Sequence, residues 1–382
     1  MSPPRKKKGS PSTGGGDPIS ALRSAVLKEA GINVISLDDA PDYGFVSTGL
    51  PLLDLLSGGG IPLGGITHVW GNSRTGKTAL ALRLGGVFQR MVPNGVVFFI
   101  DTENALSGPF ARLIGTDPSK LLLPEDGVTT EGGVVSVEKA FAAIEAAVTT
   151  YTGLVGPGTV LVVWDSWASS DAQEDLDKGY SGGRLAAKAR AASKGLARLR
   201  AALRKTRCPM VVTNQVRANV GAIFGPQELA PGGRALLFYT DLSIKLREKQ
   251  KIKGPGDDPI GAEVEFYVEK CRSAPPFRRG AFRIYFIRGA ITDSECWYPL
   301  LKRYGKATAP GGRVKIDGLE GEYTFTSIAD FAQQVENDAL LRSRLHKTLQ
   351  EALFQDNVPL APPVEETLTD QLDRAFGGDP DE

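Results

Sequence analysis

This chain of 382 residues has few cysteines and histidines, and it has no long apolar run. Three widely spaced cysteines (Cys208, Cys271 and Cys296) and two histidines argue against a disulfide framework and a zinc site, so a reducing cytosol fits best. No run of about 18 apolar residues exists, so we expect no membrane span. The N-terminus lacks the apolar core of a signal peptide. A net charge of +1 indicates no particular partner.

The composition, 41% hydrophobic and 23% charged, is typical of a soluble protein with one large domain and one or two small ones. Its two ends differ in charge. Residues 1–16 carry four cations and no acid, whereas residues 365–382 carry seven acids and one arginine. We expect both ends to lack fixed structure. They are either solubility tails or a basic arm for nucleic acid with an acidic tail that competes with it.

Residues 71–78 match the phosphate-binding pattern G-x-x-x-x-G-K-[ST]. In this pattern the glycines let backbone N–H groups turn towards phosphate oxygens, the lysine reaches the β- and γ-phosphates, and the hydroxyl binds Mg²⁺. A β-prone run precedes the pattern and residues at helical spacing follow it, which disfavours a chance match in a surface loop. We expect nucleotide contacts from Gly71, Asn72, Ser73, Arg74, Thr75, Gly76, Lys77, Thr78 and Ala79.

Strands and helices alternate along the middle of the chain. A short β-prone run predicts a strand at 66–70, continuous apolar runs predict strands at 96–100 and 160–164, and a further strand is predicted at 210–213. Helical patterns cover 77–90, 134–148 and 184–205. This alternation predicts an α/β fold with a mainly parallel, doubly wound sheet. Beyond about residue 240 the pattern changes to strands joined by turns.

Other segments surround this core. A helix is predicted from Asp17, as N-cap, to Ala30, and Phe45 to Pro62 is a turn-rich lead-in. A small mixed segment ends in a helix through Leu340 to Leu353. The predicted divisions are therefore a basic arm, a helix with its linker, the core, a small C-terminal α/β domain and an acidic tail, at 1–16, 17–44, 45–290, 291–354 and 355–382.

Polar residues follow three of the predicted strands, where ligands of open α/β sheets bind. Asp165 has the form of a Walker B acid that holds Mg²⁺ together with Thr78. Glu103 suits a general base that polarises water, and Gln215 suits a sensor of the γ-phosphate. The alternative, a polar residue that merely ends a strand, is weakest for Asp165 because a phosphate loop lies upstream.

The segment from Val216 to Pro231 is long for a loop in a compact domain. Arg217 suits contact with a phosphate, and Ile223 and Phe224 suit contact with unstacked bases. The alternative is a mobile surface loop without a ligand.

Taken together, these residues resemble a known family: the chain is similar to bacterial RecA, the ATP-dependent DNA strand-exchange recombinase. The match is collinear from about Phe45 to Ile287 and includes the phosphate loop, the strand that ends in Glu103, and Asp165-Ser166. Its most diagnostic block runs from Asn214 through Phe224-Gly225 to Gly232-Gly233, since generic P-loop ATPases do not carry it.

The resemblance implies a DNA-dependent ATPase that uses ATP and Mg²⁺ and forms a head-to-tail filament on single-stranded DNA. The filament would pair this strand with a homologous duplex. The protein would lie in the cytoplasm, associated with the nucleoid. It implies that Glu103 activates water and that Phe110 stacks on the base. Lys270 and Arg272 would reach the ATP of the neighbouring subunit, and Phe238 would couple subunits. The helix at 17–30 would pack on the next subunit, and Trp167 to Gly183 would be the first DNA-binding loop. Further DNA contacts would come from Arg217, Asn219, Ile223, Phe224, Gly232, Gly233 and Arg234.

The chain also departs from the family pattern. Ser107 and Phe110 stand where relatives carry an acid and a tyrosine, Arg272 and Leu237 replace lysines, and Gly182-Gly183 lie in the first loop. These departures indicate a divergent member. They leave two hypotheses: a recombinase that exchanges strands, or an accessory ATPase in DNA repair that does not. A ring-forming helicase motor is a third, against which the helix before the core and the loop after Gln215 argue.

Overall fold

A computed structural model describes residues 17–36, 38–39, 42–103, 106–124, 136–170, 172, 184–218, 228–229, 233–319 and 322–353. The chain divides into two compact units, 1–42 and 43–382, which are described separately. The predicted tails at 1–16 and 355–382 lie outside the described residues.

The first unit contains one helix, α1 (Pro18–Ala30), as predicted. The Asp17 carboxylate accepts hydrogen bonds from the N–H groups of Ile19 and Ser20, and Gly31 ends the helix in a left-handed conformation. None of its residues is buried, and Ile19 and Leu22 are 60% and 58% exposed. Apolar side chains of α1 are therefore exposed among the described residues of this unit, and the packing of α1 on a neighbouring subunit stays a prediction.

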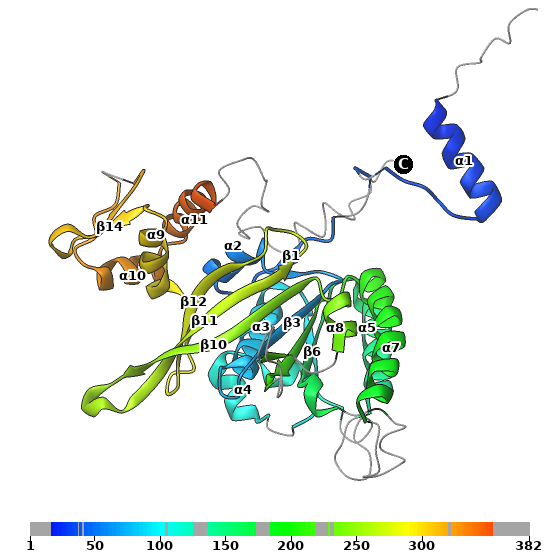
Figure 1. Ribbon diagram of the computed structural model, residues 1–382, viewed down its shortest axis with the longest axis horizontal. Helices are drawn as coiled ribbons and strands as arrows, with labels where there is room; N and C mark the ends of the chain where they lie inside the picture. Colours follow the sequence, from blue (N-terminus) through cyan, green and yellow to red (C-terminus); the bar gives the residue numbers. More distant parts are fainter. Residues whose placement is uncertain are drawn as a thin grey trace, which may run out of the picture. The chain divides into compact units, whose positions relative to one another are not determined.

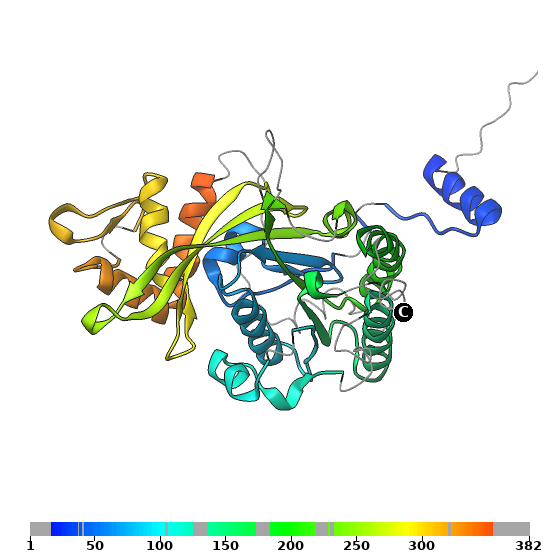
Figure 2. The same ribbon diagram turned by 60° about the horizontal axis from the view of Figure 1, so that its bottom comes forward.

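The second unit is built on a sheet whose strands, within the described residues, follow the order β13-β12-β11-β10-β3-β7-β6-β4-β5 (Figures 1 and 2). Neighbours from β10 to β5 are parallel, and those from β10 to β13 are antiparallel. The predicted α/β fold with a mainly parallel sheet is thereby confirmed. The strands are β3 (Ile66–Gly71), β4 (Val96–Asp101), β5 (Leu121–Leu122), β6 (Val160–Asp165), β7 (Met210–Gln215), β10 (Leu242–Lys253), β11 (Pro259–Cys271), β12 (Arg278–Tyr285) and β13 (Ile291–Thr292).

Helices cover both faces of the sheet at β3, β4, β6 and β7, so the side chains of these strands are mostly buried on both sides. Along β4, Val97 and Phe99 join the core that contains α2 and α3, whereas Ile100 joins the core that contains α5 and α7. Figure 1 shows α5 and α7 side by side, and the two views agree. The helices are α2 (Pro51–Ser57), α3 (Lys77–Met91), α4 (Gly108–Ile114), α5 (Val137–Val155), α7 (Arg184–Thr206), α8 (Gly233–Tyr239), α9 (Trp297–Arg303), α10 (Ile328–Asn337) and α11 (Ala339–Leu353).

Two elements differ from the sequence prediction. The turn-rich lead-in contains a helix, α2, between the short paired strands β1 (Phe45–Val46) and β2 (Ile61–Pro62). Pro51 begins the helix and the buried Asp54 accepts the N–H of Thr48 at 2.8 Å, so tertiary burial stabilises a helix of seven residues. The predicted helix at 134–148 is α5, which continues to Val155 and ends at Gly156.

The segment after β12 packs against the rest of the second unit. Asp293 follows β13, and its carboxylate accepts the N–H of Leu52 in α2 at 2.6 Å. Trp297 and Leu345, from α9 and α11, are fully buried in the same core as α2. A separate small domain beginning at residue 291 stays a prediction.

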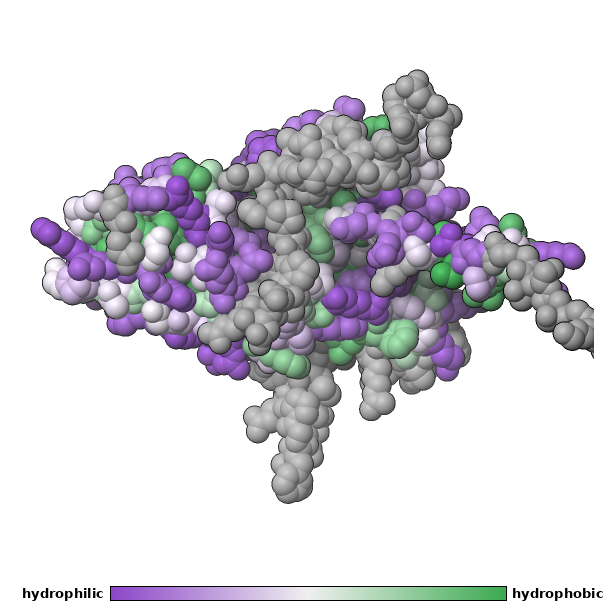
Figure 3. Space-filling view, turned by 90° about the horizontal axis from the view of Figure 1, so that it is seen from above, coloured by the Kyte–Doolittle hydropathy of each residue, from purple (hydrophilic) through white to green (hydrophobic). Residues whose placement is uncertain are grey.

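Hydrophilic residues predominate among the described residues on one face of the molecule (Figure 3). On the face seen in Figure 3, small hydrophobic groups lie between larger hydrophilic areas. No described helix is both long enough and apolar enough to cross a bilayer.

Candidate nucleotide site

The phosphate loop connects the central strand β3 to α3, which is the predicted strand–loop–helix arrangement. Atoms of neighbouring strands come so close to both glycines of this loop that a side chain there would clash. A Cβ on Gly71 would lie 2.3 Å from the carbonyl oxygen of Leu246, and one on Gly76 would lie 2.3 Å from Cδ1 of Ile284. Gly76 also has a φ of 83°, which disfavours side chains. The backbone therefore turns tightly at the amino end of α3, where the helix dipole favours an anion.

Lys77 lies inside this loop. Its ammonium group donates hydrogen bonds to the carbonyl oxygens of Gly71 at 3.1 Å and Asn72 at 2.7 Å. Burial lowers the pKa of this ammonium, and the negative charges of Asp165 and Glu103 oppose that shift. The cation is thus held at the loop by backbone groups that phosphate oxygens can replace.

Asp165 lies at the end of β6, directly across from Asp101 at the end of β4. Its carboxylate accepts hydrogen bonds from the hydroxyl of Thr78, at 2.5 Å, and from the hydroxyl of Thr213 on β7. Burial raises the pKa of Asp165, while both hydroxyl donors lower it.

The oxygen atoms of Thr78 and Asp165 fit the predicted magnesium site. Mg²⁺ prefers hard oxygen ligands, and in nucleotide sites it uses one or two protein groups together with phosphate and water. In the described part of the chain, no group of three or more Asp, Glu, His or Cys residues forms an all-protein cage for a metal. The pair therefore suits a metal that arrives with a nucleotide.

Glu103 lies two residues after β4, and three side chains donate hydrogen bonds to its Oε1. The donors are Ser166 Oγ at 2.9 Å, Ser169 Oγ at 3.2 Å and Gln215 Nε2 at 2.8 Å. The structure thus brings the predicted base and the predicted sensor into direct contact. The sequence interpretation missed the role of both serines. Ser166 had a signal, because it adjoins Asp165, but Ser169 had none.

One cavity of about 360 Å³ is lined by Glu103, Ser166 and Gln215, by residues of the phosphate loop and by apolar residues from other elements, whereas Ser169 does not line it. Phe110 on α4 lines it, as expected for a residue that stacks on a base. Tyr285, Phe286 and Gly289, at and after the end of β12, also line it and were not predicted. No local pattern marks them, because antiparallel pairing of β11 and β12 carries them to the site from late in the chain. The remaining lining residues are Ser73, Arg74, Gly76, Lys77, Thr78, Ala79, Ile114, Asp165, Ala262, Val264 and Ile284.

Lys270 and Arg272 do not line this cavity. Lys270 donates to the carbonyl oxygen of Leu237 at 2.6 Å, and Arg272 forms an ion pair of 3.3 Å with Asp241. Burial, followed by the charge of Arg272, lowers the pKa of Lys270. Because Asp241 is hydrogen-bonded to Ile66, these cations lie at the amino end of β3.

The phosphate loop follows the carboxyl end of β3, at Gly71. Five residues of extended strand separate the two ends, which is roughly 16 Å. Lys270 and Arg272 are therefore at the opposite edge of the sheet from the phosphate site of their own chain.

The predicted DNA-binding residues are described only in part. Asn219, Ile223, Phe224 and Gly232 lie outside the described residues. The backbone of Arg217 is in β8 (Arg217–Ala218), which pairs with β9 (Glu228–Leu229), and Gly233 and Arg234 begin α8. The predicted second loop thus starts directly after Gln215, at the nucleotide cavity.

Comparison with known proteins identifies the family. A family model described as the RecA N-terminal domain matches residues 25–291. The chain is 35% identical over 252 residues to Protein RecA of Fusobacterium nucleatum, a match that spans 65% of this chain and 62% of that relative. It is 33% identical over 286 residues to Protein RecA of Malacoplasma penetrans, spanning 73% of this chain and 82% of the relative.

A further relative matches a larger share of the chain. Protein RecA of Borrelia turicatae is 30% identical over 325 residues, covering 83% of this chain and 84% of its own length. Among solved structures, the RadB recombinase matches 65% of this chain and 99% of its own, with 23% identity and a TM-score of 0.46. By the extent of the family model and of these relatives, the chain belongs to the RecA family.

Proposed function

We propose that this protein is an ATP-dependent DNA recombinase that forms a filament on single-stranded DNA and pairs it with homologous duplex. One observation carries the proposal. Glu103, which is suited to activate water, is hydrogen-bonded to Gln215, the residue directly before the predicted second DNA-binding loop. Contact of that loop with DNA would move Gln215 and so change the position of the base.

The chain's own residues suggest a division of labour in hydrolysis. Lys77 would exchange its two loop carbonyls for oxygens of the β- and γ-phosphates. Thr78 and Asp165 would hold Mg²⁺, which neutralises phosphate charge when bound. Glu103 would accept a proton from the attacking water, and Gln215 would donate to the γ-phosphate once it leaves Glu103.

The positions of Lys270 and Arg272 support catalysis across a subunit interface. They lie at the sheet edge opposite their own phosphate loop, so a head-to-tail neighbour could present them to the γ-phosphate. Phe238, close to both cations and 70% exposed, and the uncovered apolar side chains of α1 supply surface for such an interface. ATP would then hold the filament together as well as being hydrolysed.

The first experiment measures ATP hydrolysis by the purified full chain with and without single-stranded DNA. We expect stimulation by DNA and filaments in electron micrographs, and hydrolysis that ignores DNA would refute the proposal. A strand-exchange assay on homologous substrates then separates the recombinase from an accessory ATPase, because only the recombinase yields joint molecules.

A mixing experiment tests the shared site. Lys77→Ala and Lys270→Ala proteins should each be inactive alone, since each lacks one half of every site. In a one-to-one mixture, about a quarter of the interfaces of a head-to-tail filament combine two intact halves. We expect the mixture to recover about a quarter of the ATP hydrolysis rate of the unsubstituted protein. A mixture as inactive as its components would contradict catalysis in trans.

A further inference from the structure

The nucleotide cavity has a polar half and an apolar half. Apart from Tyr285, its ionisable and hydrogen-bonding side chains belong to the phosphate loop or lie at and just after the carboxyl ends of β4, β6 and β7. The rest of the lining is apolar or aromatic, and the hydroxyl of Tyr285 is its one polar side-chain group. These residues are Phe110, Ile114, Ala262, Val264, Ile284, Tyr285, Phe286 and Gly289. The polar half suits a triphosphate, and the apolar half suits the base.

The apolar half is formed where α4 meets the turn after β12. A Cβ on Gly289 would lie 2.2 Å from the carbonyl oxygen of Leu113, so the turn and the helix are in contact there. Phe110 projects from this helix, and Phe286, in the turn, is 51% exposed. Two aromatic rings at the cavity can bury the faces of a flat heterocycle.

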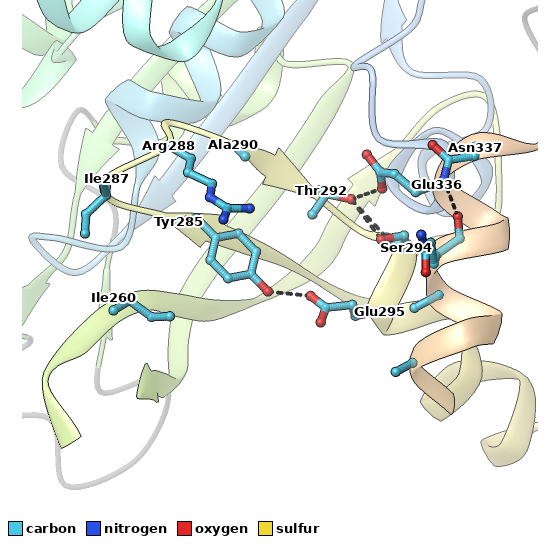
Figure 4. Close-up of a pocket in the computed structure, with 13 residues that line it drawn as sticks. Ile260, Tyr285, Ile287, Arg288, Ala290, Thr292, Ser294, Glu295, Glu336 and Asn337 are labelled. Carbon is cyan, nitrogen blue, oxygen red and sulfur yellow. Dashed lines mark hydrogen bonds between the residues drawn. The ribbon is translucent and has the colours of Figure 1, made fainter. Parts of the chain in front are cut away.

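The hydroxyl and guanidinium groups of the residues next to these rings point to a neighbouring groove. The Tyr285 hydroxyl donates to Glu295 at 2.7 Å, on the side of a neighbouring groove (Figure 4). In that view the Arg288 guanidinium also lies in the groove, and Arg288 does not line the nucleotide cavity.

Two further groups are engaged at the ends of these elements. Ser107 Oγ caps α4 by accepting the N–H of Phe110 at 3.3 Å. The N–H of Phe286 donates to the carbonyl oxygen of Ile260 at 2.9 Å. Within the described lining, Tyr285 is the one side chain of the apolar half that carries a hydrogen-bonding group, and its hydroxyl donates to Glu295.

We infer that this site binds purine nucleoside triphosphates as a class, adenosine and guanosine alike, rather than ATP alone. The inference rests on the proposed function, because it assumes a nucleotide in this cavity. Strong rejection of an analogue requires buried polar groups that the wrong ligand leaves unpaired, whereas an apolar pocket discriminates by about a hundredfold at most. Purines are favoured over pyrimidines because two fused rings bury more area against Phe110 and Phe286.

The test compares nucleotides on the full chain carrying Glu103→Gln, which keeps the triphosphate intact during titration. Calorimetry with Mg²⁺ and ATP, GTP or CTP gives three dissociation constants. We expect GTP to bind within tenfold of ATP, and CTP to bind more weakly than both. GTP binding more than tenfold weaker than ATP, or CTP binding as well as the purines, would overturn the inference and leave the proposed function standing. Failure to bind ATP would count against the proposed function itself.

A second variant tests the stacking. Phe110→Ala should raise the dissociation constants of ATP and GTP by the same factor, between about fivefold and a hundredfold. The reason is that the ring would stack on a face that both bases present. Leu154→Ala, at an 80% exposed apolar residue on α5, is the matched surface control and should leave both constants unchanged. If Phe110→Ala changed the ratio of the two constants by more than threefold, recognition by stacking alone would be wrong.

Discussion

The hydroxyl of Thr213 stabilises a buried negative charge, and its removal should destabilise the protein more at high pH than at low pH. Thr213 is fully buried on β7 and donates to Oδ1 of Asp165, while Thr78 donates to Oδ2. In Thr213→Val the shape is kept and the donor is lost. A hydrogen bond to a charged group contributes about 1.5–3 kcal/mol, and one to a neutral group about 0.5–1.5 kcal/mol.

The direction with pH follows from the pKa of Asp165. Burial already raises this pKa above its ordinary value, and the two hydroxyl donors limit the rise. Without Thr213 the pKa rises further, so the folded state releases its proton at a higher pH than the unfolded chain does. Stability therefore falls as pH rises from the unfolded pKa, about 3.9, through the folded pKa, and the loss is complete above it.

The measurement is the free energy of unfolding in guanidinium, near pH 8 and near pH 4. We expect Thr213→Val to lower it by about 2 kcal/mol at the higher pH and by about 1 kcal/mol at the lower pH. Thr67→Val is the matched control. Thr67 is a fully buried threonine on β3 whose hydroxyl has no hydrogen-bond partner among the described residues, so this change should be neutral or stabilising at both pH values. An equal loss for Thr213→Val at both pH values would refute the reasoning.

Four further changes give separate tests. Gly86→Ala on α3 should lower stability by about 1–3 kcal/mol, since its Cβ would lie 2.1 Å from the carbonyl oxygen of Gly115. Gly153→Ala, with open space around its Cβ on α5, should raise stability by about 0.5–1 kcal/mol, and a loss there would contradict the packing account. Glu103→Gln should reduce the rate of ATP hydrolysis by about 10²–10⁴-fold and leave the dissociation constant of ATP within a few-fold, so full activity would exclude Glu103 as the base. Phe238→Ala should weaken subunit association by about 2 kcal/mol in sedimentation, with nucleotide binding retained, and unchanged filaments would remove Phe238 from the interface.

Local sequence patterns were sufficient to predict the helices and strands whose signals lie within or next to their own residues. α1 has its cap and its glycine stop next to its own sequence, β4 and β6 are continuous apolar runs that end in an acid, and β3 and β7 are short β-prone runs. The helix α2 escaped prediction because seven residues carry too weak a periodic signal, and its stability comes from leucines buried by other elements. Helix α5 continues past its predicted end at Val148 to Val155, because the single Gly153 does not end the helix, which stops at Gly156.

At the site, the residue types and their strand-end positions indicated Lys77, Thr78, Glu103, Asp165 and Gln215. The phosphate loop needs glycines and a lysine at fixed spacing, and parallel strands end at one edge of the sheet. Sequence alone could not show that Glu103 and Gln215 are hydrogen-bonded, because that contact depends on how β4 and β7 are ordered in the sheet.

The sequence by itself thus determined a parallel α/β core with a phosphate loop and the acids that serve it, because these depend on local periodicity and spacing. Only the tertiary structure decided which distant residues complete the cavity. Antiparallel pairing of β11 with β12 brings Tyr285, Phe286 and Gly289 to the apolar half of the cavity, whereas antiparallel pairing of β10 with β11 keeps Lys270 and Arg272 at the far edge of the sheet. Such placements follow from strand order and register, which no short stretch of residues encodes.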